Sequence, residues 1–235
     1  MKYVSQTTLI MLAACILGGA AQPPPVMPPT GIPVAQEKKT TAEVGEKAPA
    51  FELKDQNGKT HKLSDYKDKI VVLEWFSATC PYCKKAWGNG LVPKLLKELE
   101  SSTTEVVYLA VNSTAKNTTE EEVLESGKEF FKELEASTPM LMDYDGKAGR
   151  VYGARTTPHM YVIDGESVLV YQGALSDDRR FKEGKDAETH IMRVVNQLNA
   201  GEEVSPSYVQ PWGCSVKYKQ DDNARKKGKR GHGRK

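Results

Sequence analysis

The chain has 235 residues and a formal net charge of +2 at pH 7, so its overall charge does not select nucleic acid or an anionic surface as a partner. The length allows one folded domain or two. Its four cysteines are too few and too unevenly spaced for a miniature domain held together by disulfides. They are Cys15, Cys80, Cys83 and Cys214.

Residues 1–21 have the pattern of an export signal. Lys2 supplies a positive start, and the apolar run at 8–17 is too short to span a membrane. The small residues Gly19-Ala20-Ala21 predict cleavage before Gln22, whereas Leu12-Ala13-Ala14-Cys15 resembles a bacterial lipobox that would turn Cys15 into a lipid anchor. Both alternatives predict an exported protein, in the periplasm or on the outer face of the cell envelope, where disulfides can form.

The composition then divides the chain into three parts. Residues 22–43 are rich in proline and predict a semi-extended linker. A folded domain is expected at 44–203, and 204–235 predict an irregular segment that contains Cys214 and ends in a basic, disordered tail. We expect this tail to be solvated and predict no nucleic-acid partner.

The folded domain starts with a predicted hairpin, in which strands at 48–53 and 60–63 flank a turn rich in Asp, Asn and Gly. The apolar run 70–76 predicts a buried strand, as does the later run 105–111. Between these two strands, the sequence predicts a helix over 84–100 that is interrupted at Gly88-Asn89-Gly90 and kinked or restarted at Pro93.

A capping-box pattern, Thr119 followed by Glu122, predicts the start of a further helix. The remaining predicted elements are a strand at 139–142, a hairpin of strands 160–163 and 168–171, and a last helix capped by Asp186. The alternation of strands and helices predicts one α/β domain, with a mixed central sheet covered by helices on both faces.

The most informative motif is Cys80-Pro81-Tyr82-Cys83, which lies between the buried strand 70–76 and the helix that follows it. Two cysteines separated by two residues can close a small disulfide ring or hold a metal. The free N–H groups and partial positive charge of a helix N-terminus lower the pKa of a thiol and favour the reactive thiolate. The arrangement therefore predicts redox chemistry before metal binding.

Together with its surroundings, this motif resembles the thioredoxin superfamily. Glu74 stands six residues before Cys80, where thioredoxins carry a buried Asp, and Thr157-Pro158 stands where they place a cis-proline opposite the cysteines. The N-terminal hairpin and the additional helix are similar to the exported redoxin branch, which includes the AhpC/TSA proteins and exported thiol–disulfide oxidoreductases. Exported bacterial redoxins also share the ending Gly213 to Tyr218. The resemblance implies a thioredoxin-like fold over most of the mature chain.

The resemblance also implies roles for individual residues. Cys80 would be the attacking thiolate, and the more buried Cys83 would resolve the mixed disulfide. Glu74, desolvated on a central strand, would accept the proton of Cys83.

The substrate-binding residues implied by the same resemblance are Thr157, Pro158, Pro81 and Tyr82. With a cis bond, Pro158 would pack against the disulfide, and Thr157 would pair with an extended substrate chain. We therefore predict a monomeric oxidoreductase without a cofactor or metal. It would exchange disulfides with protein thiols and with an electron-donating or electron-accepting oxidoreductase.

Two alternative functions stay open at this point. Peroxiredoxins resemble the fold but carry Pro-x-x-x-Thr/Ser-x-x-Cys; Ser77 matches the hydroxyl position, while Leu73 replaces the proline. His159, beside Pro158, could complete a copper site with Cys80 and Cys83. Cys214 has three readings: a distal resolving cysteine, a partner for Cys15, or an unpaired surface thiol.

Overall fold

The fold is taken from a computed structural model, and the structure describes residues 41–219. The predicted signal at 1–21 with Cys15, all but the last three linker residues, and the tail from residue 220 lie outside the described residues. Within residues 41–219, no helix combines the length and the hydropathy needed to cross a membrane.

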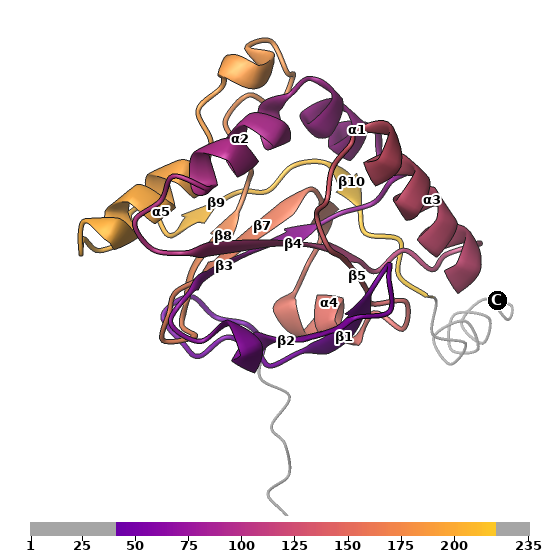
Figure 1. Ribbon diagram of the computed structural model, residues 1–235, viewed down its shortest axis with the longest axis horizontal. Helices are drawn as coiled ribbons and strands as arrows, with labels where there is room; N and C mark the ends of the chain where they lie inside the picture. Colours follow the sequence, from indigo (N-terminus) through magenta and orange to yellow (C-terminus); the bar gives the residue numbers. More distant parts are fainter. Residues whose placement is uncertain (1–40, 220–235) are drawn as a thin grey trace, which may run out of the picture. The chain divides into compact units, whose positions relative to one another are not determined.

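An eight-stranded mixed sheet, in the order β2-β1-β5-β4-β3-β7-β8-β9, forms the centre of the fold (Figure 1). β3 pairs in parallel with β4 and antiparallel with β7. A separate two-stranded sheet joins β6 to β10 in antiparallel register. The strands are β1 Glu52–Asp55, β2 Thr60–Lys62, β3 Ile70–Trp75, β4 Val106–Asn112, β5 Met140–Met142, β6 Thr156–Thr157, β7 His159–Ile163, β8 Leu169–Gly173, β9 Tyr208–Val209 and β10 Cys214–Ser215.

Helices cover both faces of the central sheet: α1, α2, α3 and α5 lie on one face, and the short α4 lies on the other (Figure 1). Their bounds are α1 Pro81–Gly88, α2 Leu91–Leu99, α3 Glu120–Glu133, α4 Lys147–Tyr152 and α5 His190–Asn199, with 3-10 turns η1 Leu63–Tyr66 and η2 Gly184–Asp186. The predicted α/β class, mixed sheet and N-terminal hairpin β1–β2 are confirmed.

Most helix ends follow local rules. The capping box is present: the Glu122 N–H donates to Thr119 Oγ1 at 3.2 Å, and the Thr119 N–H donates to Glu122 Oε2 at 2.8 Å. The predicted interruption at 88–90 separates α1 from α2, and Gly90 caps α2 with a φ of 85° that favours glycine.

Two predicted helix starts are wrong. The helix after the cysteines begins at Pro81 rather than at residue 84, because proline is well suited to the first helical position. Asp186 does not cap the last helix; it ends the η2 turn, and the Thr189 hydroxyl accepts the Met192 N–H at 3.3 Å instead.

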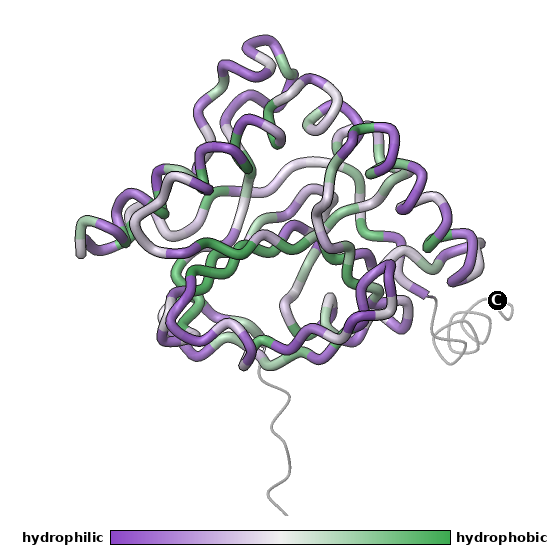
Figure 2. The backbone as a smooth tube through the Cα atoms, in the orientation of Figure 1, coloured by the Kyte–Doolittle hydropathy of each residue, from purple (hydrophilic) through white to green (hydrophobic). Residues whose placement is uncertain are grey.

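Strand β3 divides the interior into two hydrophobic cores, because successive side chains point to opposite faces. Val72 and Phe76 belong to the core under α1, α2, α3 and α5. Leu73 and Trp75 belong to the core on the side of α4 and the hairpin. Figure 2 shows the hydrophobic central strands between more hydrophilic outer elements.

The segment 204–235 was predicted to be irregular, but its described part, 204–219, contributes two strands of the fold. β9 pairs with β8, and β10 pairs with β6. The segment is anchored beyond β10, where the Lys217 carbonyl accepts the Ala115 N–H at 2.7 Å. It was missed because each strand has only two residues, which leaves no periodic pattern to read.

Candidate active site

Cys80 and Cys83 lie at the start of α1, one turn apart. Cys80 is the N-cap residue and only 4% exposed, and Cys83 is fully buried. The carbonyl of Cys80 accepts the Lys84 N–H at 2.9 Å as the first bond of the helix. The helix therefore presents its free N–H groups to the Cys80 sulfur.

These surroundings shift the pKa values of the two thiols in opposite directions. A hydrogen bond from the Cys83 thiol, with further bonds from the Thr157 and Cys214 side chains and the Cys83 N–H, outweighs burial and lowers the pKa of Cys80 to about 4. Burial, followed by the nearby Cys80 and Glu74, raises the pKa of Cys83 well above its usual value. At neutral pH, Cys80 is the thiolate and Cys83 is the thiol.

Glu74 lies on β3 behind the cysteines and is completely buried. Its carboxylate accepts hydrogen bonds from Trp87 Nε1 at 3.1 Å and from the Tyr108 hydroxyl at 2.8 Å. Burial raises the pKa of Glu74 to about 7, although both hydrogen bonds oppose this shift. A group that is half ionised near neutral pH can both accept and return a proton.

The segment opposite the cysteines contains the predicted proline. The Thr157–Pro158 peptide bond is cis. The carbonyl oxygen of Thr157 lies 3.0 Å from the Cys80 sulfur, which donates to it when protonated, so this peptide lies directly against the sulfur. The backbone of Thr157, which the sequence assigned to a substrate chain, pairs with Cys214 of β10.

Pro81 and Tyr82, the two residues between the cysteines, are exposed. The Tyr82 ring is 38% exposed and packs beside Trp212, with ring centroids 5.8 Å apart. These two residues therefore form the accessible rim of the site.

The structure places Cys214 at the site, beside Cys80. The sequence had left three roles open for this cysteine. Its thiol forms a hydrogen bond with Cys80, and burial, followed by this bond, raises its pKa to about 11. Cys80, Thr157 and Cys214 line one pocket of about 330 Å³ together with Thr79, Thr114 and Lys217. The spacing along the chain could not have predicted this contact, because 133 residues lie between Cys80 and Cys214.

His159 does not lie with the cysteines. Its ring packs on Tyr161 with centroids 4.6 Å apart, and Tyr161 belongs to the core on the α4 side of the sheet. Burial lowers the pKa of His159 to about 3, so the imidazole is neutral. Among residues 41–219, no group of three or more His, Cys, Asp or Glu side chains is arranged to hold a metal.

Ser77, the hydroxyl expected for a peroxidase, bonds to Thr79 in its own loop and to Thr114 in the segment after β4. Its Oγ lies 3.1 Å from Thr79 Oγ1 and accepts the Thr114 hydroxyl at 3.2 Å. Its carbonyl accepts the Cys80 N–H at 3.0 Å, which closes the turn before α1. Ser77 thus shapes the cysteine loop.

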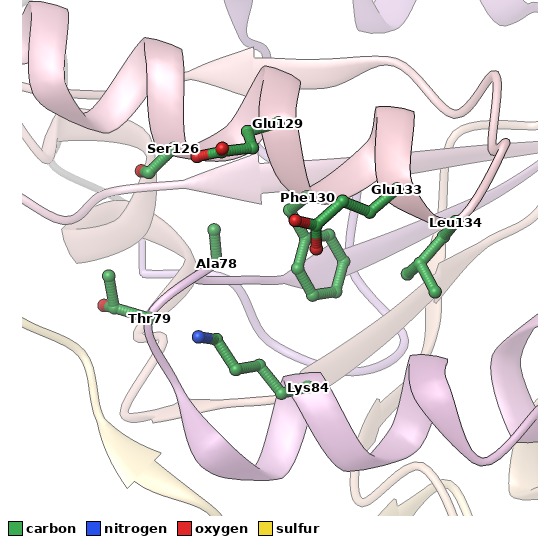
Figure 3. A pocket seen from close by; sticks show the side chains of 8 residues that line it. All are labelled: Ala78, Thr79, Lys84, Ser126, Glu129, Phe130, Glu133 and Leu134. Carbon is green, nitrogen blue, oxygen red and sulfur yellow. The ribbon is translucent and has the colours of Figure 1, made fainter.

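A second pocket of about 340 Å³ lies between the cysteine loop and α3 (Figure 3). Phe130 and Leu134 give it apolar walls, and Lys84, Glu129 and Glu133 give it charged ones. No sulfur lines it, so it is separate from the pocket that contains the thiols.

Comparisons with known proteins agree with this geometry. The thiol-disulfide oxidoreductase ResA of Geobacillus kaustophilus is 28% identical over 158 residues, which is 66% of this chain and 79% of the relative. Peroxiredoxin Bcp of Bacillus subtilis is 56% identical, but over only 36 residues, 15% of this chain and 23% of the relative.

Among solved structures, the hypothetical protein SMc02350 of Sinorhizobium meliloti matches with a TM-score of 0.67 and 26% identity, covering 77% of this chain and 98% of that one. The AhpC/TSA family matches residues 44–172, which is more than half of the chain. With this match, a mixed sheet and a thiol pair at a helix start, the chain belongs to the AhpC/TSA family of redoxins and has its thioredoxin-like fold.

Proposed function

We propose that this protein is an exported thiol–disulfide oxidoreductase that exchanges a Cys80–Cys83 disulfide with protein partners. The observation that carries the proposal is the order of three groups: Cys80 at the start of α1 behind the exposed Pro81 and Tyr82, the fully buried thiol of Cys83 one turn into the helix, and the buried carboxyl of Glu74 behind it. Relatives named thiol-disulfide oxidoreductase support the same reaction class.

In the reductive direction, the Cys80 thiolate attacks one sulfur of a partner disulfide. A Cys80–partner bond forms, and the other partner sulfur leaves as a thiolate. Cys83 then loses its proton to Glu74 and attacks Cys80, which releases the second partner thiolate and closes the Cys80–Cys83 disulfide. A donor oxidoreductase restores the dithiol, and the oxidative direction runs through the same steps in reverse.

Export is the part of the proposal that depends on residues 1–21, which lie outside the described residues. The apolar run and the two candidate processing positions support it. Processing at Cys15 would leave a lipoprotein at the envelope surface, and processing after Ala21 would leave a free periplasmic protein. Mass measurement of the mature chain separates the two.

The decisive experiment traps the mixed disulfide. In a Cys15→Ser, Cys214→Ser background, Cys83→Ser should accumulate a covalent complex between Cys80 and a disulfide-containing protein such as insulin. Without the Cys83→Ser change, the same background should reduce insulin catalytically, and a further Cys80→Ser change should end both reactions. The proposal fails if Cys80 forms no adduct and insulin reduction does not depend on it.

Thiol peroxidase activity is a second candidate, favoured by the short match to a peroxiredoxin. Leu73 in place of the proline, and the hydrogen bonds of the Ser77 hydroxyl to Thr79 and Thr114, weigh against it. Consumption of hydrogen peroxide by the Cys83→Ser variant tests it. A rate of peroxide turnover comparable to the rate at which the protein with both Cys80 and Cys83 reduces insulin would favour the peroxidase.

A further inference from the structure

Strand β10 occupies the position where the site would hold a substrate chain. Cys214 pairs with Thr157, and Ser215 pairs with Thr156, in antiparallel register. Thr157 immediately precedes the cis-proline, and its carbonyl touches the Cys80 thiol. An extended chain paired at this edge delivers its cysteine to Cys80, and the chain that is paired here is the protein's own.

A glycine allows this close approach. A side chain at Gly213 would collide with the carbonyl oxygen of Thr157, and it would lie 3.1 Å from the nitrogen of Pro158. Gly213 also has a φ of 139°, which disfavours other residues. The sequence before Cys214 is therefore suited to lying against the Thr157–Pro158 peptide.

Contacts on both sides of Cys214 hold the strand in place. Before it, Trp212 donates from Nε1 to the Ser176 carbonyl at 2.8 Å and packs on Phe181, with ring centroids 5.5 Å apart. After it, the Val216 N–H donates to the Arg155 carbonyl at 3.0 Å, and the Tyr218 hydroxyl donates to the Ala154 carbonyl at 2.8 Å. The thiol is thus presented by an anchored segment rather than by a free end.

The sulfur of Cys214 meets the reactive end of α1. Cys214 lines the same pocket as Cys80 and Pro81, and the Cys80 and Cys214 thiols shift each other's pKa in opposite directions. Cys214 is only partly buried, and this open pocket has a volume of about 330 Å³. Cys80 therefore has two thiol neighbours, Cys83 beneath it and Cys214 beside it.

We propose that Cys214 is a third redox-active thiol that exchanges with the Cys80–Cys83 disulfide and forms a Cys80–Cys214 disulfide. This inference rests on the proposed function, because it begins from the oxidised Cys80–Cys83 pair. The sulfur of Cys214 loses its proton to solvent and bonds to Cys80, the Cys80–Cys83 bond breaks, and Cys83 leaves as a thiolate that takes a proton from Glu74. One disulfide replaces another, so no external oxidant or reductant is needed.

The exchange has a consequence for substrate access. In the Cys80–Cys214 form, β10 is tied covalently over Thr157, and the attacking sulfur is closed to partners. Attack by Cys83 reopens the site in the way that it would resolve a mixed disulfide with a substrate. A partner protein must displace β10 to pair at the same edge, so the strand acts as a built-in competitor.

The test uses the full chain with Cys15→Ser, so that only the three site cysteines are present. In the Cys83→Ser variant, equilibration with reduced and oxidised glutathione, acid quenching and peptide mapping should find an intramolecular Cys80–Cys214 disulfide. Its equilibrium constant against glutathione should exceed that of a matched control by at least about tenfold, because the anchored strand raises the effective concentration of the thiol.

The matched control is Cys83→Ser with Cys214→Ser and Ser215→Cys, which moves the thiol by one residue and hence to the opposite side of the strand. Equal constants for the two proteins, or glutathione on Cys80 with Cys214 left free, would overturn the inference. The proposed function is tested without Cys214, by insulin reduction in the Cys214→Ser protein. Failure of one proposal is thereby distinguishable from failure of the other.

Discussion

The two faces of the central sheet each bury an ionisable side chain, and the two groups behave in opposite ways. Glu74 on β3 faces the cysteines, and burial raises its pKa to about 7. His159 on β7 faces the α4 side, and burial lowers its pKa to about 3. Burial disfavours the charged form of each group, but only the carboxyl reaches a pKa at which it can exchange protons near neutrality.

The partners of the two groups explain this difference in use. Glu74 has two donors, Trp87 and Tyr108, and neighbouring thiols that gain and lose protons. His159 Nδ1 lies 3.2 Å from the Tyr161 hydroxyl, and its Nε2 has no hydrogen-bond partner among the described residues. One face is arranged for proton transfer and the other for packing, so changes on the two faces should have separable effects.

The largest expected effect concerns the pH dependence of Cys80 reactivity. An ordinary thiol loses about 200-fold in thiolate between pH 8 and 5.5, whereas a pKa of about 4 keeps Cys80 ionised throughout. Its iodoacetamide alkylation rate, followed by peptide mass mapping, should therefore vary by no more than about twofold.

Two substitutions sharpen this result. Cys83→Ala removes the strongest donor to the Cys80 sulfur and should move the inflection of the alkylation profile to higher pH. Tyr161→Phe, on the other face, should leave the profile unchanged. A Cys80 profile like that of the unfolded protein would contradict the lowered pKa of Cys80, and a profile displaced by Tyr161→Phe would contradict the separation of the two faces.

The next effect compares two aromatic neighbours on opposite faces. Trp75→Ala and Phe76→Ala should each lower the free energy of unfolding by about 3–5 kcal/mol, because each empties a fully buried site. Phe76 packs on Trp87, a donor to Glu74, so only Phe76→Ala should also shift the pH profile of disulfide exchange.

Urea unfolding measures the loss of stability in the two variants, and insulin reduction at pH 5.5 to 8 measures the shift. If an alanine variant does not fold, the conservative substitutions Trp75→Phe and Phe76→Leu can be compared in the same two measurements. A shift caused by the change at Trp75 would show that the two cores are coupled.

The sequence predicted the thiol face better than the face that contains His159. The motif at 80–83 and the run 70–76 are local patterns that predict their own elements, and the resemblance to thioredoxins implied the cis bond of Thr157-Pro158. Glu74 is buried behind the cysteines, at the place that the resemblance to thioredoxins implied from its six-residue offset before Cys80.

The remaining features depend on contacts between distant segments. His159 was considered near the sulfurs because it follows Pro158, but alternation along β7 turns it to the other side of the sheet. The pairing of Cys214 with Thr157 joins residues far apart in sequence through a two-residue strand, which no periodicity reveals. Adjacency in sequence indicated the wrong neighbour in the first case and gave no indication in the second.

Glu74→Gln should change how stability depends on pH. Above about pH 4.5, the unfolded chain has released a proton that the folded protein keeps until about pH 7, so the wild type loses stability as the pH rises through this window. The loss attributable to Glu74 between pH 5 and 8 is about 2.5 kcal/mol. The glutamine variant should lack it, as measured by urea unfolding across that range.

The same substitution should slow the resolving step, because Cys83 loses its proton acceptor. A decrease of about 100-fold is expected in release of the trapped mixed disulfide at pH 7. An unchanged rate together with the altered stability profile would show that Glu74 is buried beside the site without taking part in it.

His159→Gln should reveal the opposite pH dependence, with a somewhat smaller effect. Below about pH 6.5, His159 binds a proton in the unfolded chain, whereas the buried imidazole of the folded protein binds one only near pH 3. The wild type therefore loses about 2 kcal/mol of its free energy of unfolding through His159 as the pH falls from 8 to 5. The contributions of Glu74 and His159 thus nearly cancel over this range. Relative to the wild type, Glu74→Gln should therefore lose about 2.5 kcal/mol more between pH 8 and 5, and His159→Gln should lose about 2 kcal/mol less. Since His159 touches neither sulfur, insulin reduction by His159→Gln should keep the wild-type pH profile, and a displaced profile would place the imidazole in the proton pathway after all.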